Sequence, residues 1–224
     1  MAAVFSAVYF VLRAIPTFQM VGVSAYFTAA DFLLTSMALI AGLWSGSLAV
    51  VVGTTVAYAV RPPVFFGLDF LPALANVSIA SFLLSGKRRI AVGLYLGILV
   101  AFLISPYSLL FGFYGIPYVW LHLVAFAVLL SPISGRVPLW IGRRDYHGVI
   151  AIAVLAFIGT MAQHLVGGIL YEFSVGFVGG VTPQHLMDLW RVIFWLYPTE
   201  RTILVVISTL IAVGVYRSFE RWRR

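Results

Sequence analysis

Long apolar segments without a charged residue dominate the sequence and restrict the folds that it can adopt. Residues 90–135 contain no Lys, Arg, Asp or Glu, and neither do residues 32–60. A helix of about 20 apolar residues crosses a bilayer, so the first of these segments is long enough for more than one crossing. A helix also satisfies its own backbone hydrogen bonds in lipid. We therefore expect an all-α, polytopic integral membrane bundle.

The composition and the placement of charge exclude several other classes of protein. The chain is 62% hydrophobic and 9% charged, and it has no long polar segment that could form a second domain. We therefore expect residues 1–224 to form a single transmembrane domain. The basic residues lie at the ends of apolar segments rather than in one stripe, which argues against nucleic-acid binding. The absence of cysteine excludes disulfides, cysteine-based zinc sites and thiol chemistry.

Proline, glycine and charged residues divide the chain into eight predicted spans. The turn signal Gly42–Gly46 divides residues 32–60 into two short helices, and a single helix there is the alternative. Six to eight transmembrane helices is therefore the expected range. The predicted spans are residues 3–18, the two halves of 32–60, 65–85, 90–105, 117–130, 149–170 and 202–216.

The charges also predict an orientation in the plasma membrane. Three clusters, at residues 87–89, 136–144 and 217–224, hold ten of the fourteen Lys and Arg residues, and the positive-inside rule places them and both termini in the cytoplasm. Most other ionisable residues then fall in the outer half. They are either ordinary helix-end residues or the lining of an outer polar chamber. They are Asp31, Asp69, His122, His164, Glu172, Asp188, Arg191, Glu200 and Arg201.

Residues 182–197 have the pattern of a separate amphipathic helix at the outer membrane interface. Thr182 is a candidate N-cap, and Pro183 suits the first helical position. Apolar residues then recur at helical spacing, with polar residues opposite. This helix is either a lid over a cavity or a plain interfacial anchor.

The sequence contains few signatures of catalysis. It has no Gly-x-Ser-x-Gly elbow, no phosphate-binding loop and no His-x-x-x-His pair. We expect no enzymatic activity, no metal and no cofactor. Two alternatives remain open: an enzyme acting on lipid or isoprenoid substrates, and a structural or haem-carrying subunit in which His122 and His164 ligate the iron.

Two further features lie at membrane depth or at its outer edge. Arg13 follows ten apolar or small residues, so it either snorkels to an interface, pairs with Asp31 or Asp69, or contacts an anionic ligand. Aromatic residues, including Trp120 and Trp190, gather on the outer side. An interfacial aromatic belt explains most of them, and stacking on a ring-bearing substrate is the alternative.

Three segments resemble the substrate-binding S components of energy-coupling factor (ECF) vitamin transporters. Residues 3–7 are similar to the Ala-x-x-x-Ala pattern with which S components contact their T subunit, and small residues four apart allow close helix approach. Residues 27–49 resemble the family's Asp-Phe entry to the second helix and its glycine-rich turn. Residues 197–202 resemble the proline-containing entry to its last helix. S components usually have six spans, and we place the extra hairpin within residues 90–133.

The resemblance implies capture of a vitamin-like small molecule on the outside, by a protein that assembles with a membrane-embedded T subunit and two cytosolic ATPases. It places Ala3 and Ala7 at the partner interface. It places the ligand under the loop after helix one, near residues 19–27, and among the outer ends of the last helices. The predicted substrate-binding residues are His164, Glu172, Glu200, Arg201, Asp69, Asn76, Trp120 and Trp190.

Overall fold

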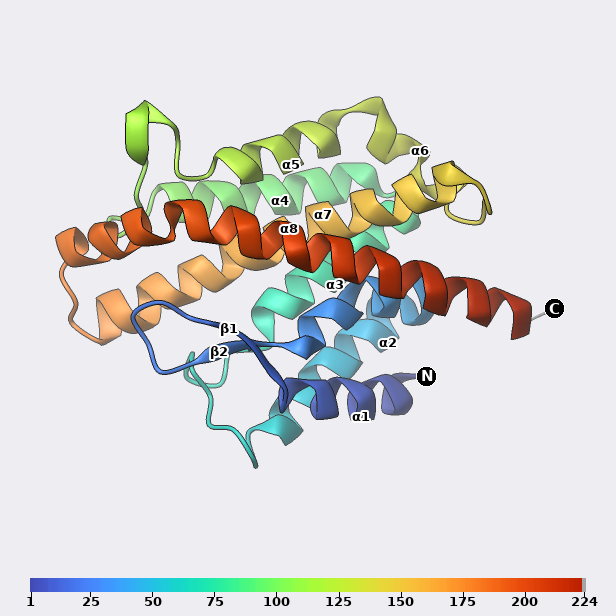
Figure 1. Cartoon of the computed structure of the whole chain (residues 1–224), viewed down its shortest axis with the longest axis horizontal. Helices are drawn as coiled ribbons and strands as arrows, with labels where there is room; N and C mark the ends of the chain where they lie inside the picture. Colours follow the sequence, from blue (N-terminus) through green and yellow to red (C-terminus); the bar gives the residue numbers. More distant parts are fainter. Residues whose placement is uncertain (223–224) are drawn as a thin grey trace.

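The computed structural model describes residues 1–222, and it is helical apart from one short β-hairpin (Figure 1). Arg223 and Arg224, which belong to the predicted basic tail, lie outside the described residues. The strands β1 (Pro16–Gln19) and β2 (Tyr26–Thr28) pair antiparallel. The helices are α1 (Ala2–Arg13), η1 (Ala29–Leu33), α2 (Leu34–Ala57), α3 (Leu71–Leu84), α4 (Arg88–Leu103), η2 (Phe113–Gly115), α5 (Trp120–Leu130), α6 (Pro132–Trp140), α7 (Tyr146–Tyr171), the π-helical η3 (Glu172–Val178) and α8 (Pro183–Trp222).

Three of the described helical stretches are long and apolar enough to cross a membrane: Ala29–Ala57, Tyr146–Val178 and Pro183–Trp222. Counting α5 and α6 as one span, bent by 64°, makes four. The predicted all-α bundle is confirmed, and its long apolar helices are compatible with a membrane protein. The predicted six to eight spans are not all long enough to cross, because α1 and α3, with 12 and 14 residues, are shorter than a typical span of about 20 residues. The first predicted span, residues 3–18, ends early because Pro16 begins strand β1.

Helix α2 is interrupted where the sequence predicts a turn. Gly42 has φ 69° and ψ −169°, a conformation open to glycine and strained for other residues. The predicted turn over Gly42–Gly46 is thus reduced to a kink at its first residue, and residues 43–57 are helical again. The two helical segments predicted within residues 32–60 are both present.

The helix predicted over residues 182–197 is not separate from the last predicted span, because these residues form the first part of the 40-residue α8. The start is as predicted, since the His185 N–H donates to Thr182 Oγ1 at 3.3 Å. Pro198 removes one backbone hydrogen bond without ending the helix, and the Thr202 hydroxyl donates to its carbonyl at 2.7 Å. The apolar stripe of this segment is buried in the protein rather than in an interface: Leu186, Trp190, Phe194 and Tyr197.

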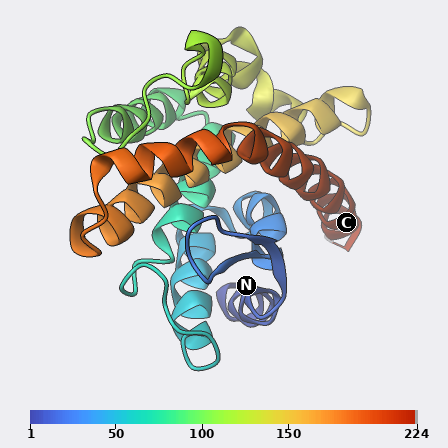
Figure 2. The ribbon, with the colours of Figure 1, turned by 60° about the vertical axis from the view of Figure 1, so that its left-hand side comes forward.

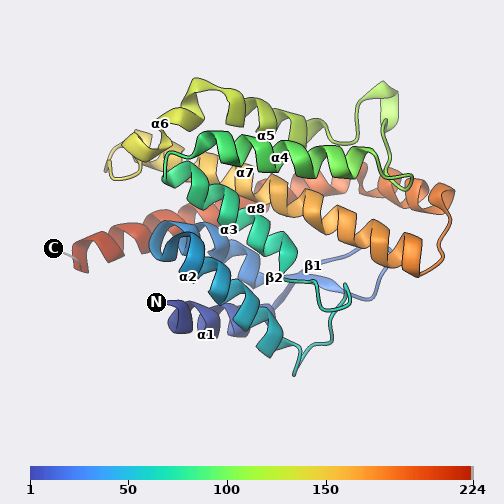
Figure 3. The ribbon, with the colours of Figure 1, turned by 180° about the vertical axis from the view of Figure 1, so that it is seen from behind.

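Helix α7 is the centre of the bundle and packs against α3, α4, α5, α6 and α8. The β-hairpin lies between α1 and α8, below the middle of α8 in Figure 1 and between the two helices again in Figure 2. The N-terminus, the last turns of α8, α6 and the α3–α4 turn lie at one end of the molecule, as Figure 3 shows from behind. Two of the predicted basic clusters, at residues 87–89 and 136–144, are therefore at the same end, away from the hairpin.

Close contact between α3 and α7 depends on Gly159. A Cβ at this position would clash with the amide of Asn76, whereas a Cβ at Gly93 on α4 would meet nothing within 4 Å. We predict that Gly159→Ala lowers the free energy of unfolding by about 1–3 kcal/mol, because Asn76 must move. Gly93→Ala, the control, should leave it unchanged or raise it by up to about 1 kcal/mol. Unfolding in mixed micelles measures both, and equal stabilities would contradict the prediction.

Candidate functional site

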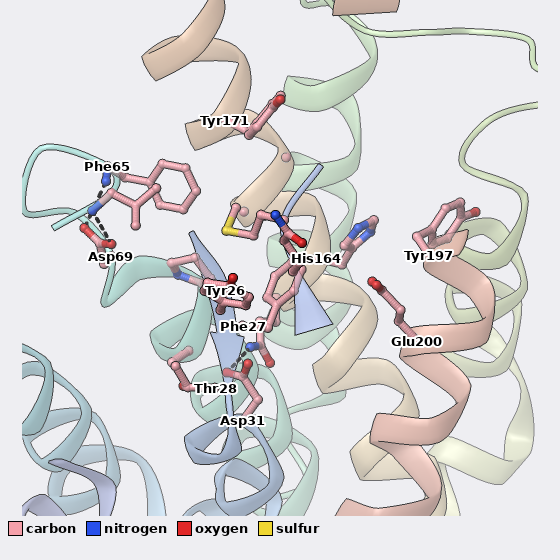
Figure 4. Close-up of a pocket in the computed structure, with 18 of the residues that line it drawn as sticks. Tyr26, Phe27, Thr28, Asp31, Phe65, Asp69, His164, Tyr171, Tyr197 and Glu200 are labelled. Carbon is pink, nitrogen blue, oxygen red and sulfur yellow. Dashed lines mark hydrogen bonds between the residues drawn. The ribbon is translucent and has the colours of Figure 1, made fainter. Parts of the chain in front are cut away.

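A cavity of about 130 Å³ lies under the β-hairpin, between the hairpin, the start of α3, α7 and α8 (Figure 4). The hairpin supplies Tyr26, Phe27 and Thr28, α7 supplies His164, and α8 supplies Tyr197 and Glu200. The cavity is close in scale to one that holds a single-ring molecule such as benzene, about 150 Å³. Three arginines and three carboxylic acids line it: Arg13, Asp31, Arg61, Asp69, Glu200 and Arg201.

Arg201 is the most deeply buried of these charges, with 1% of its surface exposed. Its guanidinium carbon lies 4.2 Å from the centre of the Phe27 ring, and its Nη2 lies 3.4 Å from Glu200 Oε2. Its Nε–H has no hydrogen-bond partner within residues 1–222. Burial of a charged group is costly unless it is fully paired. Arg201 therefore retains hydrogen-bonding capacity beside the cavity.

A chain of three polar side chains crosses the base of the cavity. The Gln163 amide of α7 donates to Asp31 Oδ1 at 2.7 Å, and its carbonyl oxygen accepts from the Asn76 amide of α3 at 2.9 Å. All three residues are buried, with Asn76 1% exposed. The chain links η1, α7 and α3 below the hairpin, so it fixes the carboxylate of Asp31 in place.

Arg61 and Asp69 hydrogen-bond to backbone groups and stabilise the loop that borders the cavity. Both carboxylate oxygens of Asp69 accept backbone N–H groups, from Val64 at 2.9 Å and from Phe65 at 3.1 Å. Arg61 donates to the carbonyl oxygen of Arg13 at 3.3 Å and to that of Tyr26 at 3.1 Å. The loop between α2 and α3 is thereby tied to the end of α1 and to the hairpin.

Arg13 lies at the cavity, with its Nε buried and without a hydrogen-bond partner among residues 1–222. Within the same residues no carboxylate lies within ion-pair distance of it, so the predicted ion pair with Asp31 or Asp69 is not formed. A second arginine beside the cavity thus has an unused donor.

Three stacked rings form the wall between α7 and α8. The His164 ring lies 4.9 Å from Tyr197 and 5.1 Å from His122, measured between centroids. His122 Nε2 and His164 Nδ1 are 2.9 Å apart and share one hydrogen bond. The Tyr197 hydroxyl donates to the carbonyl of Tyr118 at 2.7 Å. His164 is therefore held in one orientation from behind, with its remaining edge toward the cavity.

The tip of the hairpin is closed onto α7. The Tyr171 hydroxyl donates to the carbonyl oxygen of Val21 at 2.9 Å. The next residue, Gly22, has φ 80°, and a Cβ there would clash with the same hydroxyl. The tip can approach α7 this closely because Gly22 has no side chain.

The structure brings five of the eight predicted substrate-binding residues to the cavity: Asp69, His164, Trp190, Glu200 and Arg201. Residues 19–21 and Tyr26–Phe27 line it too, as the resemblance implies. Asn76 lies one layer behind, through Gln163. Trp120 opens α5, which supplies no lining residue. Glu172 is buried at the start of the π-helical turn, and neither carboxylate oxygen has a hydrogen-bond partner within residues 1–222.

Gln163 is the functional candidate that the sequence analysis missed. The predicted site residues were chosen mainly among ionisable side chains, and Gln163 is an uncharged amide in the middle of an apolar helix. A buried polar group at membrane depth is costly in any charge state, so this rule would have found Gln163 beside His164.

The paired histidines do not suit bis-histidine haem ligation. Iron between two axial imidazoles needs the whole macrocycle between the rings, whereas these rings are stacked and hydrogen-bonded to each other. Within residues 1–222 no group of three or more His, Asp or Glu side chains could hold a metal ion.

Comparison of the chain with protein-family models, with curated proteins and with solved structures found no match.

The Asn76–Gln163–Asp31 chain gives a direct test of the site. We predict that Gln163→Leu lowers the free energy of unfolding by about 2–6 kcal/mol, because it leaves one acceptor on Asp31 and one donor on Asn76 buried and unpaired. Gln19→Leu, on the exposed end of β1, is the matched control and should change it by less than about 0.5 kcal/mol. Unfolding in mixed micelles measures both variants. Similar losses in the two would show that the chain contributes nothing specific.

Proposed function

We propose that this protein is the membrane-embedded substrate-binding (S) component of an ECF-type importer, and that it captures a small micronutrient from outside the cell. It has no catalytic role in this proposal. The observation that carries it is the preformed cavity under the hairpin, which contains charged side chains with unused hydrogen-bonding groups. A largely preformed apolar pocket with a few placed polar groups is typical of small-molecule sites.

The position of the cavity supports the same proposal. The resemblance implies a ligand beneath the loop after the first helix, and here β1, β2 and their connecting turn cover the cavity. It also implies a contribution from the last helix, and α8 supplies Glu200 and Arg201. The cavity lies away from the basic end of the molecule. With that end in the cytoplasm, the cavity would open toward the outer side of the plasma membrane.

The surface of α1 supports a partner in the membrane. One face of this helix packs on α2 through Ser6 and Tyr9, which are buried. Ala3 and Ala7 are exposed on the remaining surface, together with Val4 and Val8. Small side chains on an uncovered apolar face let another helix approach closely. The T subunit, with two ATPases bound on the cytosolic side, is the partner that we propose for this face.

Native mass spectrometry of the protein purified without added ligand tests the capture of a small molecule. We expect one adduct per protein, of one mass, released by unfolding. His164→Leu should reduce the adduct at least about tenfold, since it removes a polar contact from the cavity wall. His185→Leu, an exposed histidine at the start of α8, is the matched control and should retain it.

Three results would contradict capture of a small molecule. One is a protein with no adduct under any gentle purification. Another is an adduct that persists equally in both histidine variants. The third is an adduct that wild-type protein converts to a different mass and that His164→Leu binds unchanged, which would indicate an enzyme.

The partner surface has its own test. Ala3→Leu combined with Ala7→Leu should reduce co-purification of co-expressed T subunit and ATPases at least about tenfold, because the larger side chains keep the helices apart. The small-molecule adduct should be unchanged. Ala101→Leu with Ala127→Leu, which enlarges two exposed alanines on α4 and α5, is the control. Recovery of the complex at wild-type yield from the Ala3/Ala7 variant would refute the assignment of this face.

A further inference from the structure

A second cavity, of about 120 Å³, lies at the opposite end of the bundle, between the α6–α7 loop and the last turns of α8. Its walls come from residues 141–152 and 213–221. The Arg217 guanidinium donates to the carbonyl oxygen of Arg144 at 3.1 Å, which joins α8 to the loop. We call this the basic cavity, because four arginines line it: Arg143, Arg144, Arg217 and Arg221.

The charges around the basic cavity are unbalanced. Arg143 is paired with Asp145 at 2.6 Å, and this guanidinium holds the pKa of the Asp145 carboxyl well below its usual range. Glu220 also lines the cavity, so four arginines face two carboxylates and leave a net charge of +2. Within residues 1–222, no hydrogen bond or ion pair involves the guanidinium of Arg144 or Arg221.

Part of the lining of the basic cavity is apolar. Val149, Ile152 and Val213 line it, and Val149 is 37% exposed. On α8, exposed Leu210 and Val206 precede Val213 by three and seven residues and share its helix face, and both α7 and α8 are apolar and long enough to cross a membrane. A ligand with an anionic head and an apolar tail would therefore find complementary surfaces for both parts.

We propose that the basic cavity binds a phosphate group, and that in the membrane this group is the headgroup of an anionic phospholipid. Arginine forks donate paired hydrogen bonds that match phosphate oxygens. Basic pockets between transmembrane helices at a membrane surface suit lipid headgroups. The acyl chains run along the exposed apolar surface of α7 and α8. This site is separate from the cavity under the hairpin and does not depend on the transport function.

Native mass spectrometry of the detergent-purified full chain, titrated with phosphatidylglycerol, tests the proposal. Wild-type protein should bind one phosphatidylglycerol in preference to phosphatidylcholine. Arg144→Ala combined with Arg221→Ala should weaken this binding at least about tenfold, because two charge-assisted contacts are lost. Both side chains are exposed and have no ion-pair partner within residues 1–222, so the variant should fold normally.

A matched control separates a site from general attraction by charge. Lys87→Ala with Arg89→Ala removes two exposed charges at the same end of the molecule but outside the basic cavity, and binding should stay within about twofold of wild type. Equal losses in the two double variants, or no loss in either, would overturn the proposal.

A competition arm identifies the source of the phosphate. Glycerol 3-phosphate carries the same phosphate without acyl chains, and it should displace the lipid only at concentrations far above those of phosphatidylglycerol. Tight binding of glycerol 3-phosphate that depends on Arg144 and Arg221, with no preference for the lipid, would keep the phosphate site and refute the lipid headgroup.

Discussion

The cost of burying a charge in an apolar interior is the constraint on which this structure depends. A protein that places Asp31 and Arg201 inside its bundle must surround them with partners, because neither lipid nor aliphatic side chains can solvate them. Gln163 and Asn76 meet that need for Asp31, and Glu200 with the Phe27 ring meets it partly for Arg201. Among the buried groups without a partner in residues 1–222 are the Nε atoms of Arg13 and Arg201, and both arginines line the same cavity. The arrangement of η1, α3, α7 and α8 thus stabilises the fold and leaves unpaired donors beside a cavity.

Local signals in the sequence were enough to predict the class of fold and several of its breaks. Uncharged apolar segments indicated a helical membrane bundle, Gly42 marked a kink, and Thr182–Pro183 marked the start of α8. The continuation of α8 through Pro198 could not be predicted in this way. A proline often ends or kinks a helix, whereas α8 continues through Pro198 with Phe194, Tyr197 and Leu204 buried on both sides of it. That burial comes from tertiary packing, which the pattern of residues 182–202 alone does not reveal.

Part of the candidate site could be predicted, because charged side chains at membrane depth must lie in an enclosed polar environment. This reasoning located Glu200, Arg201, His164 and Asp69 correctly at one cavity. It did not separate lining residues from supporting ones, because the direction of a side chain depends on helix phase and on which helices are neighbours. The π-helical turn at Glu172 changes that phase, and α5 carries Trp120 behind α7 rather than toward the cavity. Both the helix phase and the choice of neighbouring helices are determined by tertiary packing, so neither can be predicted from the local sequence.

The contact between His122 and His164 connects α5 to the wall of the cavity under the hairpin. Helices α4 and α5 contribute no residue to the lining of the cavity under the hairpin. Yet the imidazole of α5 stacks on the imidazole of α7 and shares its hydrogen bond. Helix α5, with α4 packed against it, therefore supports the wall of the cavity from behind. Deletion of this pair would remove the ring partner of His164 and its hydrogen bond, so the cavity wall would lose its support from behind.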